Sequence, residues 1–457
     1  MTPPVRTARQ IAFTVLEQWR DTGQFAAPLL ESVFSRNNEL SAADRGLASE
    51  LTYGVIRRQA TLNAVLKPRM KRPPEQVEPA LWTLLQLGTY QLLFHSTDSQ
   101  HASIHETVEL TKWLNNARWT GFTNGVLRSV QRDLENQFVA VAAADAIPLA
   151  PEHFLKLARP LLPNPSTDPS GYVAAAGSLP QWLVENWSNR MDFDQMLRMS
   201  MWFNTPAATW LRVNRLRTDG DTVIAALESA GISATLEEDG CMVRLAGTAH
   251  VPSLPGFNDG HFTVQDPSAT SAARLLAPVP GQRVLDLCAA PGTKSTHLAE
   301  LMENRGQVVA VDSHPERLER IAPAANRLGL SIIEPVLVDE SGEDLPSGPF
   351  DAVLVDVPCS NTGVLGKRPE ARWRLEANEP TRLARLQSRL LEQAAETVTS
   401  GGRLVYSTCS VEPVENDQVV SRFLDNRPDF EQVQRHEHVP GQPADGGFQA
   451  LLVHKGN

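Results

Sequence analysis

One stretch, residues 283–297 with the sequence RVLDLCAAPGTKSTH, constrains the fold more than any other part of the chain. The apolar run 284–287 predicts a buried parallel strand that breaks at the small residues 289–292 and restarts as a helix. Such a turn brings backbone N–H groups and the positive end of a helix beside a ligand pocket, and its small side chains allow close approach. We therefore predict a ligand site here, although an ordinary strand-to-helix turn can show the same pattern.

The elements that follow indicate a doubly wound α/β sheet. A second strand, 307–311, ends in Asp312, roughly 20 residues after the turn, where such a sheet binds ribose hydroxyls. Predicted strands at 332–338, 351–355 and 403–407 end near Asp339, Asp356 and Cys409. Because the carboxyl ends of parallel strands share one edge of the sheet, these four polar residues are expected to converge there.

The turn matches neither common phosphate-binding motif. It has no G-x-G-x-x-G, and Gly292-Thr293-Lys294 lacks the Gly-Lys pair and the upstream glycine of a P-loop. We therefore expect a nucleoside cofactor of a different type.

Length and composition indicate a multidomain globular protein. A chain of 457 residues suggests about two to four domains. No run of 18 apolar residues exists, so we expect no membrane span, and the N-terminus lacks the apolar core of a signal peptide. Four cysteines lie far apart without C-x-x-C spacing or clustered histidines, which argues against metal sites and disulfides and favours a cytoplasmic location.

Charge gives a divided signal about nucleic acid. The net charge of −11 speaks weakly against general nucleic-acid binding, but residues 57–72 hold six basic and no acidic side chains, and a second basic stretch covers 367–389. These runs are either RNA-binding surfaces or solvated helix faces.

The chain divides into four predicted segments. Residues 1–138 show helical periodicity throughout and predict a bundle of five to seven helices that serves for binding. Residues 139–172 are rich in proline and predict a linker with one short helix near 154–158. Residues 173–260 predict a small α+β module, and residues 261–457 the doubly wound domain.

Two cysteines, Cys359 and Cys409, follow predicted strands of that sheet and are flanked by polar residues. A thiolate at either position could attack an electron-poor carbon, while Asp356 could hold a substrate amine or transfer a proton. Buried structural cysteines are the alternative.

Four segments together carry a family resemblance: DLCAAPGTKSTH, the Ala-Val-Asp ending in Asp312, DVPCSNTGVLGKRPEARW and YSTCSVEPVEN. They are similar, in this order, to the motifs of the RNA cytosine-C5 methyltransferases of the Sun/Fmu family. DRGLASELTYGVIRR and FTNGVLRSV resemble the NusB-like RNA-binding domain of its bacterial branch, which modifies small-subunit ribosomal RNA. The resemblance implies a NusB-like all-α N-terminal domain, an RRM-like α+β module and a class I methyltransferase domain.

The resemblance also implies a cofactor and its site. S-adenosylmethionine would occupy a pocket formed by Asp312 on the ribose, Asp339 by the adenine and Asp356 near the methyl donor. Arg317 matches a family position in this pocket, although a surface role explains it equally well. The loop itself would contribute Cys288, Ala289, Ala290, Pro291, Gly292, Thr293 and Lys294.

In the family, the thiolate at the position of Cys409 adds to C6 of a flipped-out cytosine, and the cysteine at the position of Cys359 assists release. DNA cytosine methyltransferases use a Pro-Cys nucleophile instead, which would be Cys359, and the residues alone do not choose between them. Lys294 is expected to contact the base; a solvent-facing lysine at the helix start is the alternative. Three positions depart from the usual family motifs: Thr293, Val357 and Asn361.

The sequence thus predicts an S-adenosylmethionine-dependent enzyme that methylates C5 of a cytosine in 16S ribosomal RNA, as a monomer. A non-catalytic RNA-binding or ribosome-assembly factor on the same scaffold is the main alternative. A DNA or small-molecule methyltransferase is disfavoured by the N-terminal domain.

Overall fold

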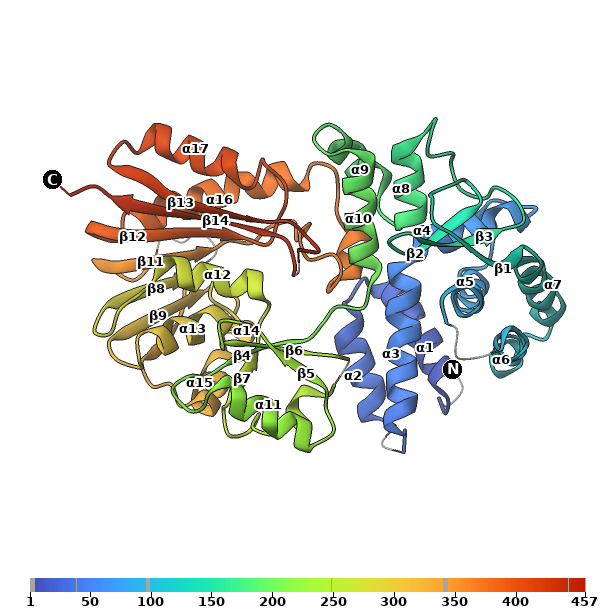
Figure 1. The fold of residues 1–457 in the computed structure, drawn as a ribbon, viewed down its shortest axis with the longest axis horizontal. Helices are drawn as coiled ribbons and strands as arrows, with labels where there is room; N and C mark the ends of the chain where they lie inside the picture. Colours follow the sequence, from blue (N-terminus) through green and yellow to red (C-terminus); the bar gives the residue numbers. More distant parts are fainter. Residues whose placement is uncertain are drawn as a thin grey trace. The chain divides into compact units, whose positions relative to one another are not determined.

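The computed structural model describes residues 5–37, 39–95, 99–247, 249–339, 344–442 and 444–456 (Figure 1). The chain forms two compact units. The first contains Met1–Thr205 together with Gly366–Arg374, and the second contains Pro206–Leu365 together with Leu375–Asn457. The domain boundaries predicted from the sequence stay predictions.

The first unit begins with a bundle of helices, as its periodicity predicts. Thr7 accepts a hydrogen bond from the N–H of Gln10, and the Gln10 side chain accepts one from the N–H of Thr7, so the first helix starts with a capping box. The long helices pack through apolar stripes such as Ile11 and Val15, both fully buried. The bundle helices are α1 Ala8–Thr22, α2 Ala26–Ser35, α3 Ala42–Arg57, α4 Gln59–Leu66, α5 Pro79–Phe94, α6 Gln100–Trp113 and α7 Arg118–Arg132.

The predicted linker contains a sheet, which corrects the sequence analysis. Strands β1 Leu134–Val139, β2 Ala146–Ala150 and β3 His153–Leu157 form an antiparallel sheet in the order β1-β3-β2. The helix predicted near 154–158 is wrong. Phe154, Leu155 and Leu157 are buried in a strand whose partners supply the backbone hydrogen bonds, a stabilisation that local periodicity does not reveal. Helices α8 Pro169–Gly177, α9 Gln181–Ser188 and α10 Phe193–Asn204 complete the unit.

A late segment of the chain, Gly366–Arg374, belongs to this first unit. Arg372 is fully buried and donates hydrogen bonds to the carbonyl oxygens of Arg57 and Ser178, both at 3.0 Å, and to Oδ1 of Asn204 at 2.8 Å. Glu370, also buried, accepts a 2.8 Å bond from the N–H of Ala26. The segment thereby satisfies backbone groups of the helical unit.

The second unit contains the small α+β module. Its four-stranded antiparallel sheet has the order β5-β6-β4-β7, and α11 packs on it through Val223 and Leu227. Asp219 caps α11 by accepting a 2.8 Å bond from the N–H of Thr222. The elements are β4 Trp210–Val213, α11 Gly220–Ser229, β5 Ala234–Leu236, β6 Met242–Leu245 and β7 Phe262–Val264.

The second unit also contains a seven-stranded mixed sheet with the order β10-β9-β8-β11-β12-β14-β13. Strands β8 to β12 run parallel, and β14 pairs antiparallel with both β12 and β13. The strands are β8 Arg283–Leu287, β9 Gln307–Asp312, β10 Ile333–Leu337, β11 Phe350–Asp356, β12 Val398–Thr408, β13 Phe430–His438 and β14 Gly447–His454.

Helices cover both faces of this sheet (Figure 1). Alternate strand residues such as Leu285 and Val353 pack with α16 and α17, whereas Val284 and Leu354 pack with α12, α13 and α15. The chain leaves β8 toward β9 on one side and meets β11 on the other, so the sheet has a topological switch point between β8 and β11. Ligands bind beyond the strand ends at such points. The helices are α12 Pro267–Leu276, α13 Thr293–Leu301, α14 Pro315–Leu318, α15 Ile321–Leu328, α16 Glu379–Ala395 and α17 Asp417–Asn426.

Candidate functional site at the carboxyl edge of the sheet

The turn after β8 is held by the tip of β9. Asp312 is 4% exposed, and its carboxylate accepts 3.0 Å hydrogen bonds from the N–H groups of Ala290 and His314. Arg317 donates a 2.5 Å bond to the carbonyl oxygen of Ala290. The structure thus brings together the predicted loop, Asp312 and Arg317, and the exposed side chain of Arg317 contacts the loop.

The backbone of the turn requires unusual conformations. Gly292 has φ +96°, and a Cβ there would lie 3.0 Å from Ile321 of α15. Cys288 has φ +63°, which is costly for a residue with a side chain. Burial raises the pKa of the Cys288 thiol, so this cysteine is held as a neutral thiol. The loop therefore offers main-chain groups rather than a reactive thiol.

Asp286, on β8, is a site residue that the sequence analysis did not single out. It is fully buried, and its Oδ2 accepts a 2.6 Å bond from Ser295, whereas Oδ1 has no hydrogen-bond partner among the described residues. Burial raises the pKa of this carboxyl to about 7. The available signal was an acidic residue inside a buried apolar strand.

Lys294 and Asp356 form an ion pair across the switch point. Lys294 Nζ donates to Asp356 Oδ2 at 2.6 Å, and Ser407 Oγ donates to Asp356 Oδ1 at 3.0 Å. The Lys294 side chain is only 16% exposed, so the alternative of a solvent-facing lysine is wrong. Burial alone would lower the pKa of Lys294, but the Asp356 carboxylate outweighs it and raises the pKa above the ordinary value.

The two predicted thiols lie together. Cys359 Sγ is 3.1 Å from Cys409 Sγ, and both are free cysteines. Their loops follow neighbouring parallel strands, since Asp356 of β11 is in register with Ser407 of β12. The hydrogen bond to Cys409, with burial, raises the pKa of the Cys359 thiol well above its ordinary value. Both effects favour the neutral thiol form of Cys359.

Glu415 connects the two cysteine loops through hydrogen bonds. It is fully buried and accepts hydrogen bonds from the N–H and hydroxyl of Ser360, from the hydroxyl of Ser410 and from Nε2 of Gln387. Burial raises the pKa of Glu415. Sequence reasoning missed this residue, although it lies inside the quoted segment YSTCSVEPVEN.

Asp339 lies beyond the end of β10, and its N–H donates to Asp344 at 3.0 Å. It is exposed, unlike Asp312 on the neighbouring strand. The structure thus places Asp339 at the predicted edge, with a more solvated side chain than the other acidic residues of the site.

The carboxylates fit the predicted cofactor chemically. Asp312 lies at the tip of β9, where ribose hydroxyls bind in doubly wound sheets. Asp286 Oδ1 is a buried acceptor that lacks a donor in the described chain, and S-adenosylmethionine carries an ammonium group and two ribose hydroxyls. The set of residues is therefore compatible with that molecule.

The small module also supports this edge of the large sheet through Arg212 on β4. Arg212 is 1% exposed, donates to the Thr293 carbonyl oxygen at 3.0 Å and forms a 2.8 Å ion pair with Glu300. It therefore fixes the start of α13, which carries Lys294.

Several arginines of the two basic stretches are buried and stabilise the fold. Arg57, Arg58 and Arg372 are buried, with Arg58 donating to the Pro148 carbonyl at 3.1 Å, so these residues do not form a solvated face.

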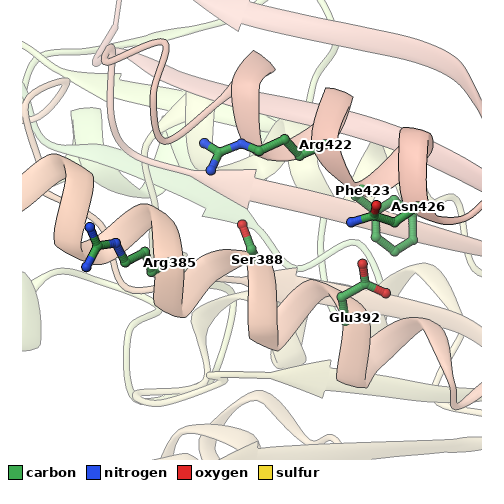
Figure 2. Close-up of a pocket in the computed structure, with 6 residues that line it drawn as sticks. All are labelled: Arg385, Ser388, Glu392, Arg422, Phe423 and Asn426. Carbon is green, nitrogen blue, oxygen red and sulfur yellow. The ribbon is translucent and has the colours of Figure 1, made fainter.

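Exposed arginines flank a groove of about 280 Å³ between α16 and α17 (Figure 2). Figure 2 shows Arg385 and Arg422 toward one end of this groove and Glu392 with Asn426 toward the other. The groove is lined by Arg385, Ser388, Glu392, Arg422, Phe423 and Asn426.

Neither a metal-binding cluster nor a membrane-spanning helix is present among the described residues. No group of three or more His, Cys, Asp or Glu side chains could hold a metal ion. None of the described helices combines the length and apolarity needed to cross a membrane.

Comparison with known proteins assigns all three parts of the chain. Residues 273–454 match the family model described as 16S rRNA methyltransferase RsmB/F, residues 6–132 match the NusB family, and residues 179–251 match the ferredoxin-like domain of RsmF/B-like methyltransferases. The predicted fold class is thereby confirmed, with the small module identified as ferredoxin-like.

Individual relatives cover nearly the whole chain. A probable ribosomal RNA small subunit methyltransferase B of Bacillus subtilis is 35% identical over 430 residues, which is 93% of this chain and 90% of the relative. Ribosomal RNA small subunit methyltransferase B of Escherichia coli O127:H6 is 33% identical, in an alignment that covers 98% of this chain and 99% of the relative. The solved structure of PH0851 has a TM-score of 0.77 at 25% identity, covering 98% and 99% of the two chains. The chain therefore belongs to the RsmB/F family of S-adenosylmethionine-dependent 16S rRNA methyltransferases.

Proposed function

We propose that this methyltransferase acts on C5 of a cytosine in 16S rRNA, through a transient covalent bond between Cys409 and C6 of the base. The observation that carries the proposal is the pair of free thiols, with Cys359 Sγ and Cys409 Sγ 3.1 Å apart beside the Lys294–Asp356 ion pair. An enzyme that methylates an oxygen or an exocyclic nitrogen has no use for two adjacent thiols at its reacting edge.

A nucleophilic thiol makes methylation at C5 of cytosine chemically possible. Cytosine C5 is a poor nucleophile until C6 is saturated. In the proposed reaction, the Cys409 thiolate forms a bond to C6, and the electron pair of the C5=C6 double bond becomes available at C5. When bound, S-adenosylmethionine would supply an electrophilic methyl group to C5, with its S–CH3 bond breaking and S-adenosylhomocysteine leaving as the neutral thioether. Loss of the C5 proton to a base then restores the double bond as the C6–S bond breaks and the thiolate leaves.

The direction of the thiol hydrogen bond favours Cys409 as the nucleophile. Because Cys409 Sγ donates to Asn361 Oδ1 at 3.3 Å, Cys359 is the donor in the contact between the two sulfurs, and the sulfur of Cys409 accepts. A sulfur that accepts a hydrogen bond is stabilised as a thiolate, whereas its partner stays protonated. Cys359 is then placed to return a proton or assist release of the adduct. This physical argument agrees with the family resemblance, which implies Cys409 as the nucleophile, whereas the residues alone left the DNA-type Pro-Cys alternative open.

We assign Asp356 and Lys294 to the pyrimidine ring. The carboxylate of Asp356 accepts from Lys294 and Ser407 and is fixed by both, so it can accept a further hydrogen bond from the exocyclic amine or from a protonated N3 of the base. Protonation at N3 would favour attack at C6, because it withdraws electrons from the ring. Lys294 keeps Asp356 oriented and contacts the base.

The cofactor would be held by the turn and the acidic strand ends. Residues 288–294 offer their main chain, Asp312 the ribose contact and Asp339 a contact beside the adenine. Arg317 would act by holding the Ala290 carbonyl and thereby the shape of the turn. The NusB-like helices would bind the RNA, and we expect the protein to act as a monomer.

The test uses S-adenosylmethionine with a labelled methyl group, and unmodified 16S RNA both deproteinised and in small-subunit particles. Wild type is compared with Cys409→Ala and Cys359→Ala, and denaturing gels report protein–RNA adducts. We expect Cys409→Ala to lose both transfer and adduct, and Cys359→Ala to accumulate adduct.

Each other outcome has a definite meaning. Swapped losses would make Cys359 the nucleophile. Label found on a base position other than cytosine C5, by nucleoside mass spectrometry, would refute the C5 assignment. Binding of S-adenosylmethionine and RNA without transfer to any RNA form would support the non-catalytic assembly factor.

A further inference from the structure

Asn361 follows the Pro-Cys pair at a position that departs from the usual family motif, and its backbone conformation admits few residue types. Its φ of +61° lies in the left-handed region, which asparagine tolerates better than other non-glycine residues. Glycine would satisfy this backbone equally well. The side chain of Asn361 is therefore an addition that the turn itself does not require.

That side chain joins the two cysteine loops. Asn361 Nδ2 donates a 2.8 Å hydrogen bond to the carbonyl oxygen of Cys359, and Asn361 Oδ1 lies 3.3 Å from Cys409 Sγ. A carbonyl oxygen can only accept, so the Cys359 carbonyl fixes the NH₂ end of the amide. The opposite end, Oδ1, must then face the sulfur of Cys409, and it can accept the S–H of that thiol.

The backbone holds this arrangement in place. The N–H of Gly363 donates to the Cys409 carbonyl at 3.0 Å, and the N–H of Val364 donates to the Asn361 carbonyl at 3.0 Å. A Cβ on Gly363 would lie 2.6 Å from the carbonyl oxygen of Gly446 and 2.8 Å from that of Cys409. The loop carrying Asn361 is thus packed directly onto the loop carrying Cys409.

We propose that Asn361 is a positioning residue that holds the resting Cys409 as a thiol and orients its sulfur between Cys359 and the Asn361 amide. The role as regulator of a nucleophile rests on the proposed function of Cys409. The three groups form a chain in which Cys359 S–H donates to Cys409 and Cys409 S–H donates to Asn361. Loss of the Cys409 proton leaves the thiolate facing the lone pairs of Asn361 Oδ1, so Asn361 favours the protonated form.

The other ionisable groups around Cys409 remain when Asn361 is changed. Lys294 on α13 interacts electrostatically with Cys409 and is paired with Asp356 at the end of β11. Cys359 donates to Cys409, and Glu415 accepts hydrogen bonds from both cysteine loops. Removing the amide therefore isolates one contribution to the ionisation of Cys409.

The test is the pH dependence of Cys409 alkylation by iodoacetamide, read on the Cys409 peptide by mass spectrometry without RNA. Asn361→Gly removes the amide and keeps the backbone conformation. We expect its alkylation midpoint to fall by about half a pH unit, the equivalent of one ordinary hydrogen bond to the thiol. Asn361→Asp adds a negative charge beside the sulfur, so its midpoint should rise instead.

A matched control removes the effect of the substitution type. Asn115 has φ +53° on the exposed surface of the helical unit, and Asn115→Gly should leave the midpoint where it is in wild type. The acid limb of the pH profile of single-turnover methyl transfer should shift to lower pH in Asn361→Gly, together with the alkylation midpoint.

An unchanged or higher midpoint in Asn361→Gly would overturn the positioning role. Retained methyl transfer in Cys409→Ala would instead overturn the proposed function, whatever the alkylation of Asn361→Gly shows.

Discussion

The substitution Asp286→Asn should make the second unit more stable than wild type at alkaline pH and progressively less so toward acid pH. Asp286 is fully buried on β8, and burial raises the pKa of its carboxyl from 3.8 to about 7. Between these two values the folded state binds a proton that the unfolded state has released. Wild-type stability contributed by this group is therefore largest below pH 4 and is lost as the pH rises toward and through 7.

The size of the effect follows from the shift. A displacement of roughly three pKa units corresponds to about 4 kcal/mol in total, and about 2.5 kcal/mol of this falls between pH 5 and pH 8. Asparagine cannot ionise, so the variant lacks this dependence. Its NH₂ group would occupy the position of Oδ1, which has no partner among the described residues, and that costs about 1–3 kcal/mol at every pH. The constant cost cancels when the two pH values are compared.

The measurement is urea-dependent hydrogen exchange of the full-length protein, followed on peptides from β8 and β11 so that the second unit is read alone. The stability of Asp286→Asn minus that of wild type should increase by about 2–3 kcal/mol from pH 5 to pH 8. Val284→Ala, a truncation in the same strand, should give the same difference at both pH values. A pH-independent difference for Asp286→Asn would show that Asp286 is not protonated in the folded protein at pH 5, and would refute the reasoning.

Three further outcomes can be checked. Arg372→Met should destabilise the first unit by about 3 kcal/mol, because it leaves buried carbonyl acceptors unpaired, and Arg372→Lys should recover only part of this in thermal unfolding. Gly292→Ala should weaken S-adenosylmethionine binding in calorimetry by about tenfold, since φ +96° strains a side chain; unchanged affinity would contradict this. Replacing Arg385 and Arg422 together with alanine should lower the salt dependence of RNA binding by about two ion equivalents if the groove contacts phosphate, whereas an unchanged slope would exclude it.

The parts of the fold that the sequence predicted are those with strong local signals. The buried strands of the central sheet are continuous apolar runs such as 308–311, and each ends in a polar residue that marks the functional edge. By contrast, β13 has the sequence FEQVQRHEH, whose exposed side chains give no strand pattern. It is a strand because the backbone of β14 offers it a partner. Only the folded sheet supplies that information.

Charged residues were the least predictable feature for the same reason. Arg57 and Arg58 lie in a run that is typical of a basic surface, yet both are buried, because backbone carbonyl oxygens of other segments accept hydrogen bonds from their guanidinium groups. The role of Glu415 is likewise set by a partner distant in sequence, Ser360. A pattern of residue types carries no record of such partners.

The contact between Cys359 and Cys409 depends on the topology of the sheet, which local sequence patterns do not reveal. Fifty positions separate them, and each follows a different strand at the same edge of the sheet. The sequence could place both thiols at that edge, but their contact depends on β11 and β12 being neighbours with Asp356 opposite Ser407. From that register, three further residues reach Cys359 and two reach Cys409. Since α16 returns the chain to the adjacent parallel strand, the crossover itself brings the two sulfurs together. A change that shifted this register by one residue would separate the thiols without altering either cysteine.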